Sequence, residues 1–360
     1  FGEILNLNLE DTEYVLKSKN GPLYLGGIAA ASKGIISGCS VSGNINIEQL
    51  NNDNLISIYA GGICAANYDG KIDRCASAMI ISAESNGGIY VGGITGGNYE
   101  NGIIENCYNI GEILAVIDYE YNAYGYVGGI IGNNEGQVNY CHNIGVVDSR
   151  RSNSPDGAYS GGIAGINSGT MKNCYYSELQ YNAAGKNSSS GAERLAFDKL
   201  SEQDSYEGFD FDNVWVIDEQ ETSAPYLKNQ KALNLPENTS EFAGGNGTIF
   251  SPYRIETAKQ LANINNHLGA NYILCNDISF DDADFQGGGM FYNEGKGWIS
   301  IGCDFYSDFE GIFNGQNNTI KGLVVRNQKY MGLFGSSHGE IKNVNVEDIR
   351  IESDSVNTIY

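Results

Sequence analysis

Three histidines, His142, His267 and His338, are the side chains of this chain best suited to hold zinc or to move a proton near neutral pH. None belongs to an HExxH pattern, in which two histidines one helical turn apart bind zinc and the glutamate activates water. A serine nucleophile elbow, a phosphate-binding loop and a dinucleotide fingerprint are also absent. The sequence therefore predicts that this segment is not a peptidase, and it assigns no catalytic residue.

Short acidic runs form the second group with chemical potential. Asp281, Asp282 and Asp284 offer hard oxygen ligands for calcium, although the spaced loop with a terminal glutamate is missing. These residues, or Asp210 and Asp212, would be the carboxylates of a polysaccharide lyase or hydrolase. Acidic runs of this length are more common in solvated loops. Calcium is the single cofactor hypothesis, and a carbohydrate-active enzyme is the alternative function.

The cysteines are nucleophiles by type, but their spacing indicates a structural role. Five of the eight recur at one position of a repeat, namely Cys39, Cys75, Cys107, Cys141 and Cys174. Stacked neighbours would have parallel Cα–Cβ directions, which suit a disulfide poorly. The CxxC pairs of a zinc site are absent. We predict a reduced, buried ladder of small apolar side chains.

Aromatic side chains supply the candidate binding site. Tyr108, His142 and Tyr175 each follow one of these cysteines and are predicted to point outward in an exposed row. Such a row could stack on a sugar or on a partner chain, or its rings could stack on one another and serve the architecture. A second column is predicted to be architectural; it consists of Tyr24, Tyr59, Tyr90, Tyr126 and Tyr159.

A repeated phrase positions these residues. Its plainest copy runs from Tyr126 to Val147, and five copies carry Gly-Gly-Ile at residues 26, 61, 92, 128 and 161. Each copy consists of short alternating runs that break at Asn and Gly, which predicts strands joined by tight turns. A strand-built repeat in the low thirties predicts a parallel β-helix with one coil per copy. Isoleucines would fill the interior, and turn asparagines would bond to their copies above and below.

The repeat phrase stops near Ser177, and residues 192–234 are predicted to form a closing cap that begins with a short helix from Ala192 to Leu200. After a linker near residues 235–240, Thr257 and Gln260 have capping-box spacing and predict a helix that plugs a second solenoid.

The predicted domains are residues 1–180, a β-helix whose N-terminal part is missing; 181–240, cap and linker; and 241–360, the start of a second β-helix whose C-terminal part is missing. The similarity of Gly339–Asp348 to Gly2–Asp11 is the basis for expecting a window cut from a longer chain.

Charge and composition exclude several classes of partner and of structure. The formal net charge of −23 argues against nucleic acid and against anionic lipid, because both require a basic face. No apolar run reaches the length of a membrane span, so no membrane insertion by this segment is expected. A hydrophobic content of 41% argues against wholesale disorder.

The phrase Gly-Ile-x-Gly, a polar turn residue, a turn glycine, an apolar residue and then Asn-Cys-Tyr resembles the GLUG motif of bacterial extracellular and cell-surface proteins. Regions that accompany IgA-cleaving metallopeptidases carry the same motif. Residues 247–277, 298–302 and 309–315 resemble the usual opening of a GLUG unit. The resemblance implies architecture and an extracellular location rather than an activity.

These observations predict an all-β chain, a right-handed parallel β-helix with short capping helices in two tandem units. The predicted function is a non-catalytic segment of a bacterial surface or secreted protein, which acts as a rigid stalk or an adhesin-like binding surface. Glycans or surface proteins are the predicted partners, together with self-association through solenoid ends or tandem repeats.

Overall fold

The computed structural model describes residues 2–18, 21–49, 57–117, 123–151, 157–177, 180, 182–217, 223–228, 230–233, 241–249, 251–303 and 308–353. The chain divides into two compact units, Phe1–Leu235 and Pro236–Tyr360. The linker predicted at residues 235–240 lies outside the described residues.

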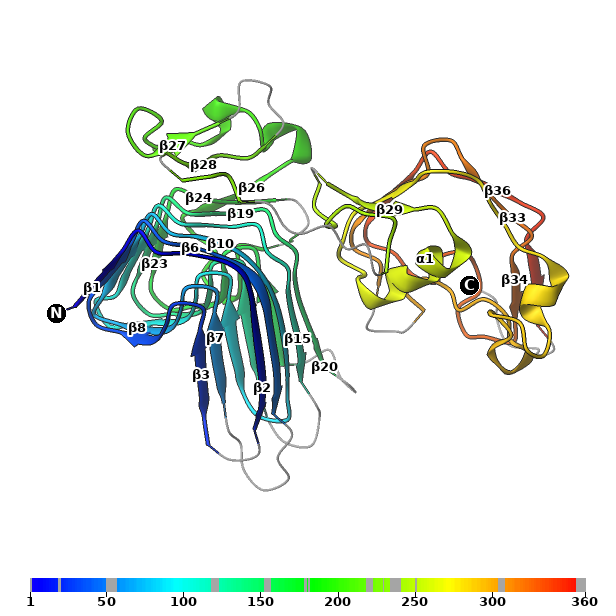
Figure 1. Ribbon diagram of the computed structural model, residues 1–360, viewed down its shortest axis with the longest axis horizontal. Helices are drawn as coiled ribbons and strands as arrows, with labels where there is room; N and C mark the ends of the chain where they lie inside the picture. The colour runs from blue at the N-terminus through cyan, green and yellow to red at the C-terminus, as the bar shows by residue number, and fades with distance from the viewer. Residues whose placement is uncertain are drawn as a thin grey trace. The chain divides into compact units, whose positions relative to one another are not determined.

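The first unit is a parallel β-solenoid, as predicted from the repeats (Figure 1). Each coil contributes a strand in turn to four sheets, which we call A, B, C and D. Paired strands run parallel throughout these sheets. Equivalent residues of successive coils align, as shown by Tyr59, Tyr90 and Tyr126 in sheet C. Consecutive Gly-Gly-Ile phrases are therefore consecutive coils.

The strands of sheets A and B carry the first half of each coil. Sheet A consists of β1 (Glu3–Leu5), β5 (Ile35–Ser37), β9 (Lys71–Asp73), β13 (Ile103–Glu105), β18 (Gln137–Asn139) and β23 (Thr170–Lys172). Sheet B consists of β2 (Asn8–Ser18), β6 (Ser40–Gln49), β10 (Ala76–Ser85), β14 (Tyr108–Asn109), β19 (His142–Asn143), β24 (Cys174–Ser177) and β26 (Ala192–Leu195). In the same sheet β15 (Ile113–Ile117) pairs with β10, and β20 (Val147–Arg151) pairs with β15.

Sheets C and D complete the coil on either side of the Gly-Gly-Ile corner. Sheet C consists of β3 (Leu23–Gly26), β7 (Ile58–Gly61), β11 (Ile89–Gly92), β16 (Gly125–Gly128) and β21 (Ala158–Gly161). Sheet D consists of β4 (Ala29–Ser32), β8 (Cys64–Tyr68), β12 (Thr95–Tyr99), β17 (Ile131–Asn134), β22 (Ala164–Asn167) and β25 (Ala184–Asn187).

The glycine pair makes this corner sterically tight. A Cβ on Gly61 would lie 2.2 Å from Cys64 O, and a Cβ on Gly62 would lie 2.2 Å from Gly93 O in the next coil. Because those atoms belong to the backbone, a larger residue would separate the coils. The two glycines are therefore needed for close approach of the chain to itself.

Stacked apolar side chains fill the coils of the first unit. Ile63, Ile94, Ile130 and Ile163 are fully buried and belong to one core cluster, which also contains the five repeat cysteines. Burial of each such isoleucine contributes on the order of 1.5 to 3 kcal/mol. The core thus repeats in place along the coil axis.

The segment that follows the coils differs from the predicted cap. Ala192–Leu195 is strand β26 and pairs in parallel with β24, so the helix predicted from Ala192 to Leu200 is wrong. Tertiary pairing with the preceding coil decides the conformation here, since the strand edge of β24 supplies backbone partners that a short helix lacks. Among the described residues of the predicted cap, Phe197–Lys199 and Gln203–Ser205 are helical, as the 3-10 helices η1 and η2.

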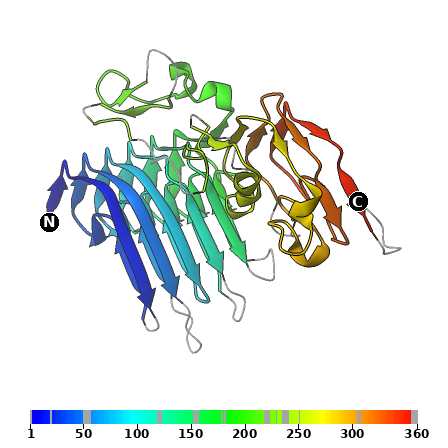
Figure 2. The same cartoon turned by 45° about the vertical axis from the view of Figure 1, so that its right-hand side comes forward.

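We call the described residues between 196 and 233, namely 196–217, 223–228 and 230–233, the strap. It contains η1, η2 and an antiparallel pair of strands, β27 (Trp215–Val216) and β28 (Tyr226–Leu227). Figures 1 and 2 show the strap on the outside of sheet B, where it lies across several coils. It therefore covers one face of the solenoid.

The second unit has a core rich in aromatic side chains. Three parallel sheets surround it: β29 (Tyr253–Ile255), β30 (Tyr272–Leu274), β32 (Ile312–Asn314) and β35 (Glu340–Lys342); β31 (Ile278–Ser279), β33 (Thr319–Lys321) and β36 (Asn345–Glu347); and β34 (Val324–Arg326) with β37 (Arg350–Glu352). The largest buried side chains of its core cluster are Trp298, Tyr272, Phe242, Phe309 and Phe313.

Helix α1 (Ala258–Asn263) follows β29, and the 3-10 helices η3 (Ile264–Asn266), η4 (Asp282–Phe285) and η5 (Asn293–Gly295) complete the unit. The capping box predicted for α1 is present: Thr257 Oγ1 accepts from Gln260 N, and the Gln260 side chain accepts from Thr257 N. Leu261 is fully buried in the core cluster, so the helix packs on the core of the second unit. None of the described helices is long and apolar enough to cross a membrane.

Candidate functional site

The aromatic row predicted to be exposed is buried. Tyr108, His142 and Tyr175 do stack in one outward column, and the ring centroids of Tyr108 and His142 are 5.3 Å apart. Their exposed fractions are only 2%, 1% and 4% because the strap covers them. The prediction of an exposed binding row is therefore wrong.

Aromatic residues of the strap meet this column directly. The Trp215 ring lies 5.4 Å from the His142 ring, and Phe209 packs edge to face on Tyr175 with centroids 5.5 Å apart. Tyr206 packs on Tyr175 in the same way at 5.1 Å. Buried aromatic pairs of this kind contribute about 0.5 to 1.5 kcal/mol each beyond the burial of their area. The column is a docking platform for the chain's own strap.

Polar contacts fix the strap in position. His142 Nε2 donates to Pro225 O at 2.7 Å, which assigns the proton of the neutral ring to Nε2. Tyr175 Oη donates to Glu207 O at 3.1 Å, and Asn173 Nδ2 donates to the same oxygen at 2.7 Å. Burial lowers the pKa of His142 to about 4. The imidazole is consequently neutral at physiological pH.

Sequence reasoning missed the strap residues that make this interface. A signal was present: the outward column is aromatic only at Tyr108, His142 and Tyr175, whereas the earlier coils have Asn8, Ser40 and Ala76 at the same position. A matching set of aromatic residues follows the coils, namely Tyr206, Phe209, Phe211 and Trp215. An aromatic column on the last coils, followed by a cluster of aromatic residues after the coils, indicates that the two sets of rings pack on each other.

The second tyrosine column forms a stacked ladder on sheet C. Tyr24, Tyr59 and Tyr90 lie 4.8 Å apart, with ring planes within 6° of one another. At this spacing each ring face is occupied by its neighbour, so the rings offer edges and hydroxyl groups rather than faces. At the far end, Lys186 Nζ lies 4.9 Å from the Tyr159 ring and donates to Tyr126 Oη at 3.4 Å.

The repeat cysteines lie inside the coils. The structure shows Cys39, Cys75, Cys107, Cys141 and Cys174 as buried, free thiols. Cys75 N donates to Cys107 Sγ at 3.4 Å, and Cys107 N donates to Cys141 Sγ at the same distance. Burial raises the pKa of the Cys75, Cys107 and Cys141 thiols well above the ordinary value. Neutral thiols of this kind are poor nucleophiles and poor metal ligands.

Turn asparagines form the predicted hydrogen-bonded ladder. Asn67 Nδ2 donates to Asn98 Oδ1 at 2.9 Å, Asn98 Nδ2 to Asn134 Oδ1 at 3.1 Å, and Asn134 Nδ2 to Asn167 Oδ1 at 2.8 Å. All four side chains are buried. Their amides therefore hold one coil to the next and are not available to a ligand.

The acidic run proposed for calcium has local structural partners instead. Asp281 and Asp284 close a capping box at η4, in which Asp281 N donates to Asp284 Oδ2 at 2.8 Å. Asp282 Oδ1 accepts from Arg350 Nη2 at 3.3 Å. In the part of the chain that the structure describes, no three His, Cys, Asp or Glu side chains converge as a metal site requires. The three aspartates are thus not brought together as ligands, because the turn directs them to different partners.

In the alternative catalytic pair, the carboxylate of Asp210 is also engaged locally. Asp210 accepts hydrogen bonds from the backbone and side chain of Asn213, which lower the pKa of its carboxyl group. A carboxylate held ionised in this way is a poor general acid.

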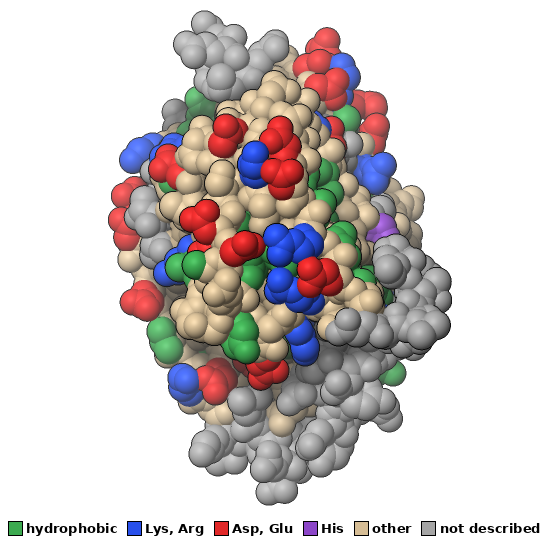
Figure 3. Space-filling model, turned by 90° about the vertical axis from the view of Figure 1, so that its right-hand side faces the viewer, with side chains coloured by type: hydrophobic (Ala, Val, Ile, Leu, Met, Phe, Trp, Pro, Cys, Tyr) green, Lys and Arg blue, Asp and Glu red, His purple; other side chains and the backbone are tan. Residues whose placement is uncertain are grey.

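On the face drawn in Figure 3, acidic and basic side chains are interspersed with small apolar patches.

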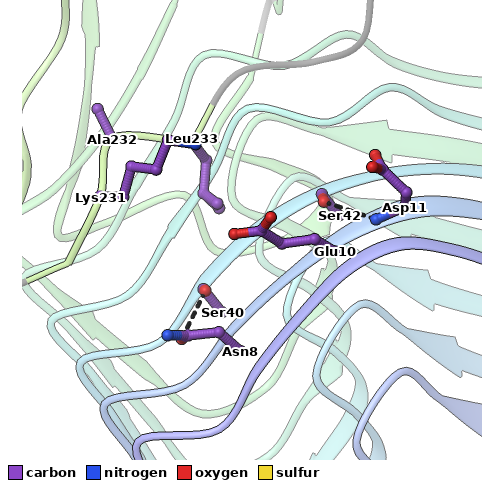
Figure 4. Close-up of a pocket in the computed structure, with 8 residues that line it drawn as sticks. All are labelled: Asn8, Glu10, Asp11, Ser40, Ser42, Lys231, Ala232 and Leu233. Carbon is purple, nitrogen blue, oxygen red and sulfur yellow. Dashed lines mark hydrogen bonds between the residues drawn. The ribbon is translucent and has the colours of Figure 1, made fainter.

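Polar cavities lie along the last arm of the strap, which we define as residues 227, 228 and 230–233. One cavity of about 580 Å³ is lined by Leu5, Asn6, Asn8, Ser37, Gly38, Arg74, Leu227, Lys228 and Gln230. A second, of about 210 Å³, is lined by Asn8, Glu10, Asp11, Ser40, Ser42, Lys231, Ala232 and Leu233 (Figure 4). A third, of about 230 Å³, lies at the other end of the strap next to Tyr175 and Glu193.

The model of the GLUG motif matches residues 87–114. A protein from Evansella cellulosilytica that is described as a Gly-rich membrane protein is 37% identical over 115 residues, which are 30% of this chain and 12% of that protein. The matched stretch therefore spans about an eighth of that relative's length. A crystal structure of a protein from Bacteroides ovatus, assigned as an immunoglobulin A1 protease, is 17% identical with a TM-score of 0.40, and the match covers 63% of this chain and 76% of that one. The matched residues span β11 to β15, so the first unit is a parallel β-solenoid that carries a GLUG motif, as the repeat phrase predicted.

Proposed function

We propose that the chain is a non-catalytic segment of a bacterial surface or secreted protein, and that it is a rigid scaffold with a binding surface for glycan or protein partners. The observation that supports this proposal most is the burial and mutual hydrogen bonding of the repeated polar residues. The asparagine ladder from Asn67 to Asn167 is buried and bonded from coil to coil. In an enzyme, repeated polar side chains of this kind could contact a substrate. Here they form hydrogen bonds that stack one coil on the next.

The alternative, a carbohydrate-active enzyme, has less support. Its candidate carboxylates have structural partners: Asp281 and Asp284 in a capping box, Asp282 beside Arg350, and Asp210 beside Asn213. A glycosidase needs two carboxyl groups that face the same bond across a substrate-sized gap.

The surface location is part of the same proposal. The relative from Evansella cellulosilytica is described as a membrane protein, and the GLUG motif at residues 87–114 resembles that of bacterial extracellular proteins. A net charge of −23 is compatible with solubility outside the cell and keeps identical surfaces apart.

Incubation of the protein with polysaccharide and protein substrates tests the non-catalytic role. We expect no new reducing ends, unsaturated sugars or peptides to appear. Turnover that is lost when Asp281, Asp282 and Asp284 are together replaced by asparagine would overturn the proposal and establish the enzyme. Turnover that survives this triple substitution but disappears in Asp210→Asn would do the same through the other acidic run.

A further inference from the structure

The two cavities along the strap arm form a continuous polar surface. Asn8 lines both cavities, and the arm residues Leu227 to Leu233 form the opposite wall. Figure 4 shows Lys231, Ala232 and Leu233 across the smaller cavity from Asn8, Glu10 and Ser40. The larger cavity, at about 580 Å³, falls within the range of roughly 300 to 1,000 Å³ that small-ligand sites occupy.

The cavities result from a change in the outward column of sheet B. In later coils this column holds Tyr108, His142 and Tyr175, and the strap packs directly on their rings. In the first two coils the same column holds Asn8 and Ser40, which are too short to fill the space under the arm. The arm nevertheless lines the same cavities as Asn8 and Ser40, and Gln230 Nε2 donates to Arg74 O of the third coil at 3.1 Å. An overhanging arm above small polar residues produces a sheltered polar space.

Three charged side chains that line the smaller cavity are unpaired among the described residues. The carboxylates of Glu10 and Asp11 and the ammonium group of Lys231 have no hydrogen-bond or ion-pair partner among the residues that the structure describes. Asn8 accepts from Ser40 Oγ at 2.8 Å through Oδ1, which leaves its amide N–H groups for other partners. Two carboxylates of the strand wall and a lysine of the arm therefore line the same cavity.

This combination matches the chemistry of a polyhydroxylated, uncharged ligand. A carboxylate accepts hydrogen bonds from the hydroxyl groups of a sugar, and an ammonium or amide group donates to its ring and hydroxyl oxygens. Two unpaired carboxylates in a chain of net charge −23 disfavour phosphate and acidic sugars. None of the described residues that line the two cavities is aromatic, so hydrogen bonds rather than ring stacking would provide the recognition.

We propose that the cavities beside Asn8, Glu10 and Lys231 bind a neutral saccharide unit of a glycan. This inference rests on the proposed function as a binding scaffold and names the site and the ligand class. The strand wall supplies acceptors through Glu10 and Asp11, the arm supplies a donor through Lys231, and the strap holds the two walls at a fixed separation. The bound unit would lie between the first two coils and residues 227, 228 and 230–233 of the arm.

Titration calorimetry of the whole chain with mannohexaose, galactohexaose and chitohexaose tests the site. At least one of these probes should bind, and Glu10→Gln and Lys231→Met should each weaken its binding about tenfold, because each removes one charge-assisted hydrogen bond. Glu13→Gln is the matched control, since Glu13 lies on the same strand and is exposed but lines neither cavity. Its affinity should stay within a factor of two of wild type.

A second variant fills the space instead of removing charge. Ser40→Tyr places at the first coils the residue type that Tyr108 provides later in the same column. It should abolish binding while the melting temperature stays at the wild-type value or rises. Absence of binding by all three probes would overturn the site, as would tighter binding of a sialylated hexasaccharide than of the neutral probes. Saccharide binding that Glu10→Gln, Lys231→Met and Ser40→Tyr all leave unchanged would overturn the site but leave the proposed binding function intact.

Discussion

Replacement of His142 by phenylalanine measures how the strap is held to the solenoid. The imidazole is buried among Tyr108, Trp215 and Phe209. Its Nε2 donates to Pro225 O at 2.7 Å, and Nδ1 is buried without a hydrogen-bond partner among the described residues. A second proton would have to go on Nδ1, in surroundings that offer no acceptor. Burial therefore lowers the pKa of His142 from 6.5 to about 4.

The sign of the pH dependence follows from this shift. The unfolded chain binds the proton near pH 6.5 and the folded chain only near pH 4, so the neutral ring stabilises the fold fully above pH 6.5. That stabilisation is lost as the pH falls from 6.5 to about 4, and it changes no further below that. At about 1.4 kcal/mol per pKa unit, the loss is about 3 kcal/mol. The tyrosines around the ring stay neutral over this range.

Urea denaturation of wild type and His142→Phe across this pH window gives the test. The Trp298→Phe substitution in both proteins leaves Trp215 of the strap as the fluorescent reporter, since the chain has two tryptophans. Loss of the bond to Pro225 O costs phenylalanine about 1 to 3 kcal/mol at every pH. The wild-type advantage should shrink by about 3 kcal/mol between pH 6.5 and 4, because other titrating groups cancel in the difference. A difference that does not change with pH would refute a neutral, buried His142.

Three further predictions concern the columns and the second unit. Under denaturing conditions without reductant, alkylation followed by mass spectrometry should label all five repeat cysteines, and a disulfide between any two of them would contradict the buried ladder. Asn134→Ala should lower the free energy of unfolding by about 2 to 4 kcal/mol, because Asn98 and Asn167 each lose a buried partner; Asn133→Ala, one residue away and less buried, is the control and should change it by less than about 1 kcal/mol. Thr257→Ala should destabilise the second unit by about 1 kcal/mol through loss of its helix cap, as measured by Trp298 fluorescence, and no change would argue against the capping box.

The coils could be predicted from the sequence because the residues that define them are local and recur in every copy. Gly-Gly-Ile marks the corner between sheets C and D, and the interval from one copy to the next equals one coil. The inward cysteines and the asparagine ladder followed from the same alignment of copies. The helix at Ala258–Asn263 was predictable because its capping box lies within four residues. Each of these inferences needs only neighbouring residues or equivalent positions.

The strap interface was not predictable in the same way. Alternation placed Tyr108, His142 and Tyr175 correctly on the outside of the coil, but exposure depends on what covers that face. The covering residues, such as Trp215, are tens of residues away and outside the repeat. For the same reason the strand at Ala192–Leu195 was predicted as a helix, since its partner β24 belongs to another coil.

The cavities beside the arm depend both on the small outward residues of the first coils and on the position of the strap. Asn8 and Ser40 occupy an ordinary outward position, and nothing in their sequence neighbourhood indicates that the described arm residues line a cavity with them. Only the position of the strap turns these small polar residues into the wall of a cavity. A site of this kind therefore follows from tertiary structure and not from a motif.

Nitration of the folded protein with tetranitromethane, followed by peptide mapping, tests the central claim that the outward aromatic column serves the strap rather than a ligand. The reagent attacks exposed phenolate groups, and burial both shields Tyr175 and raises its pKa to about 12. Tyr24 and Tyr124 are 39% and 44% exposed and should be modified, whereas Tyr108 and Tyr175 should remain unmodified until the protein is unfolded. Modification of Tyr108 and Tyr175 as fast as that of Tyr24 would show an uncovered column and would contradict the account.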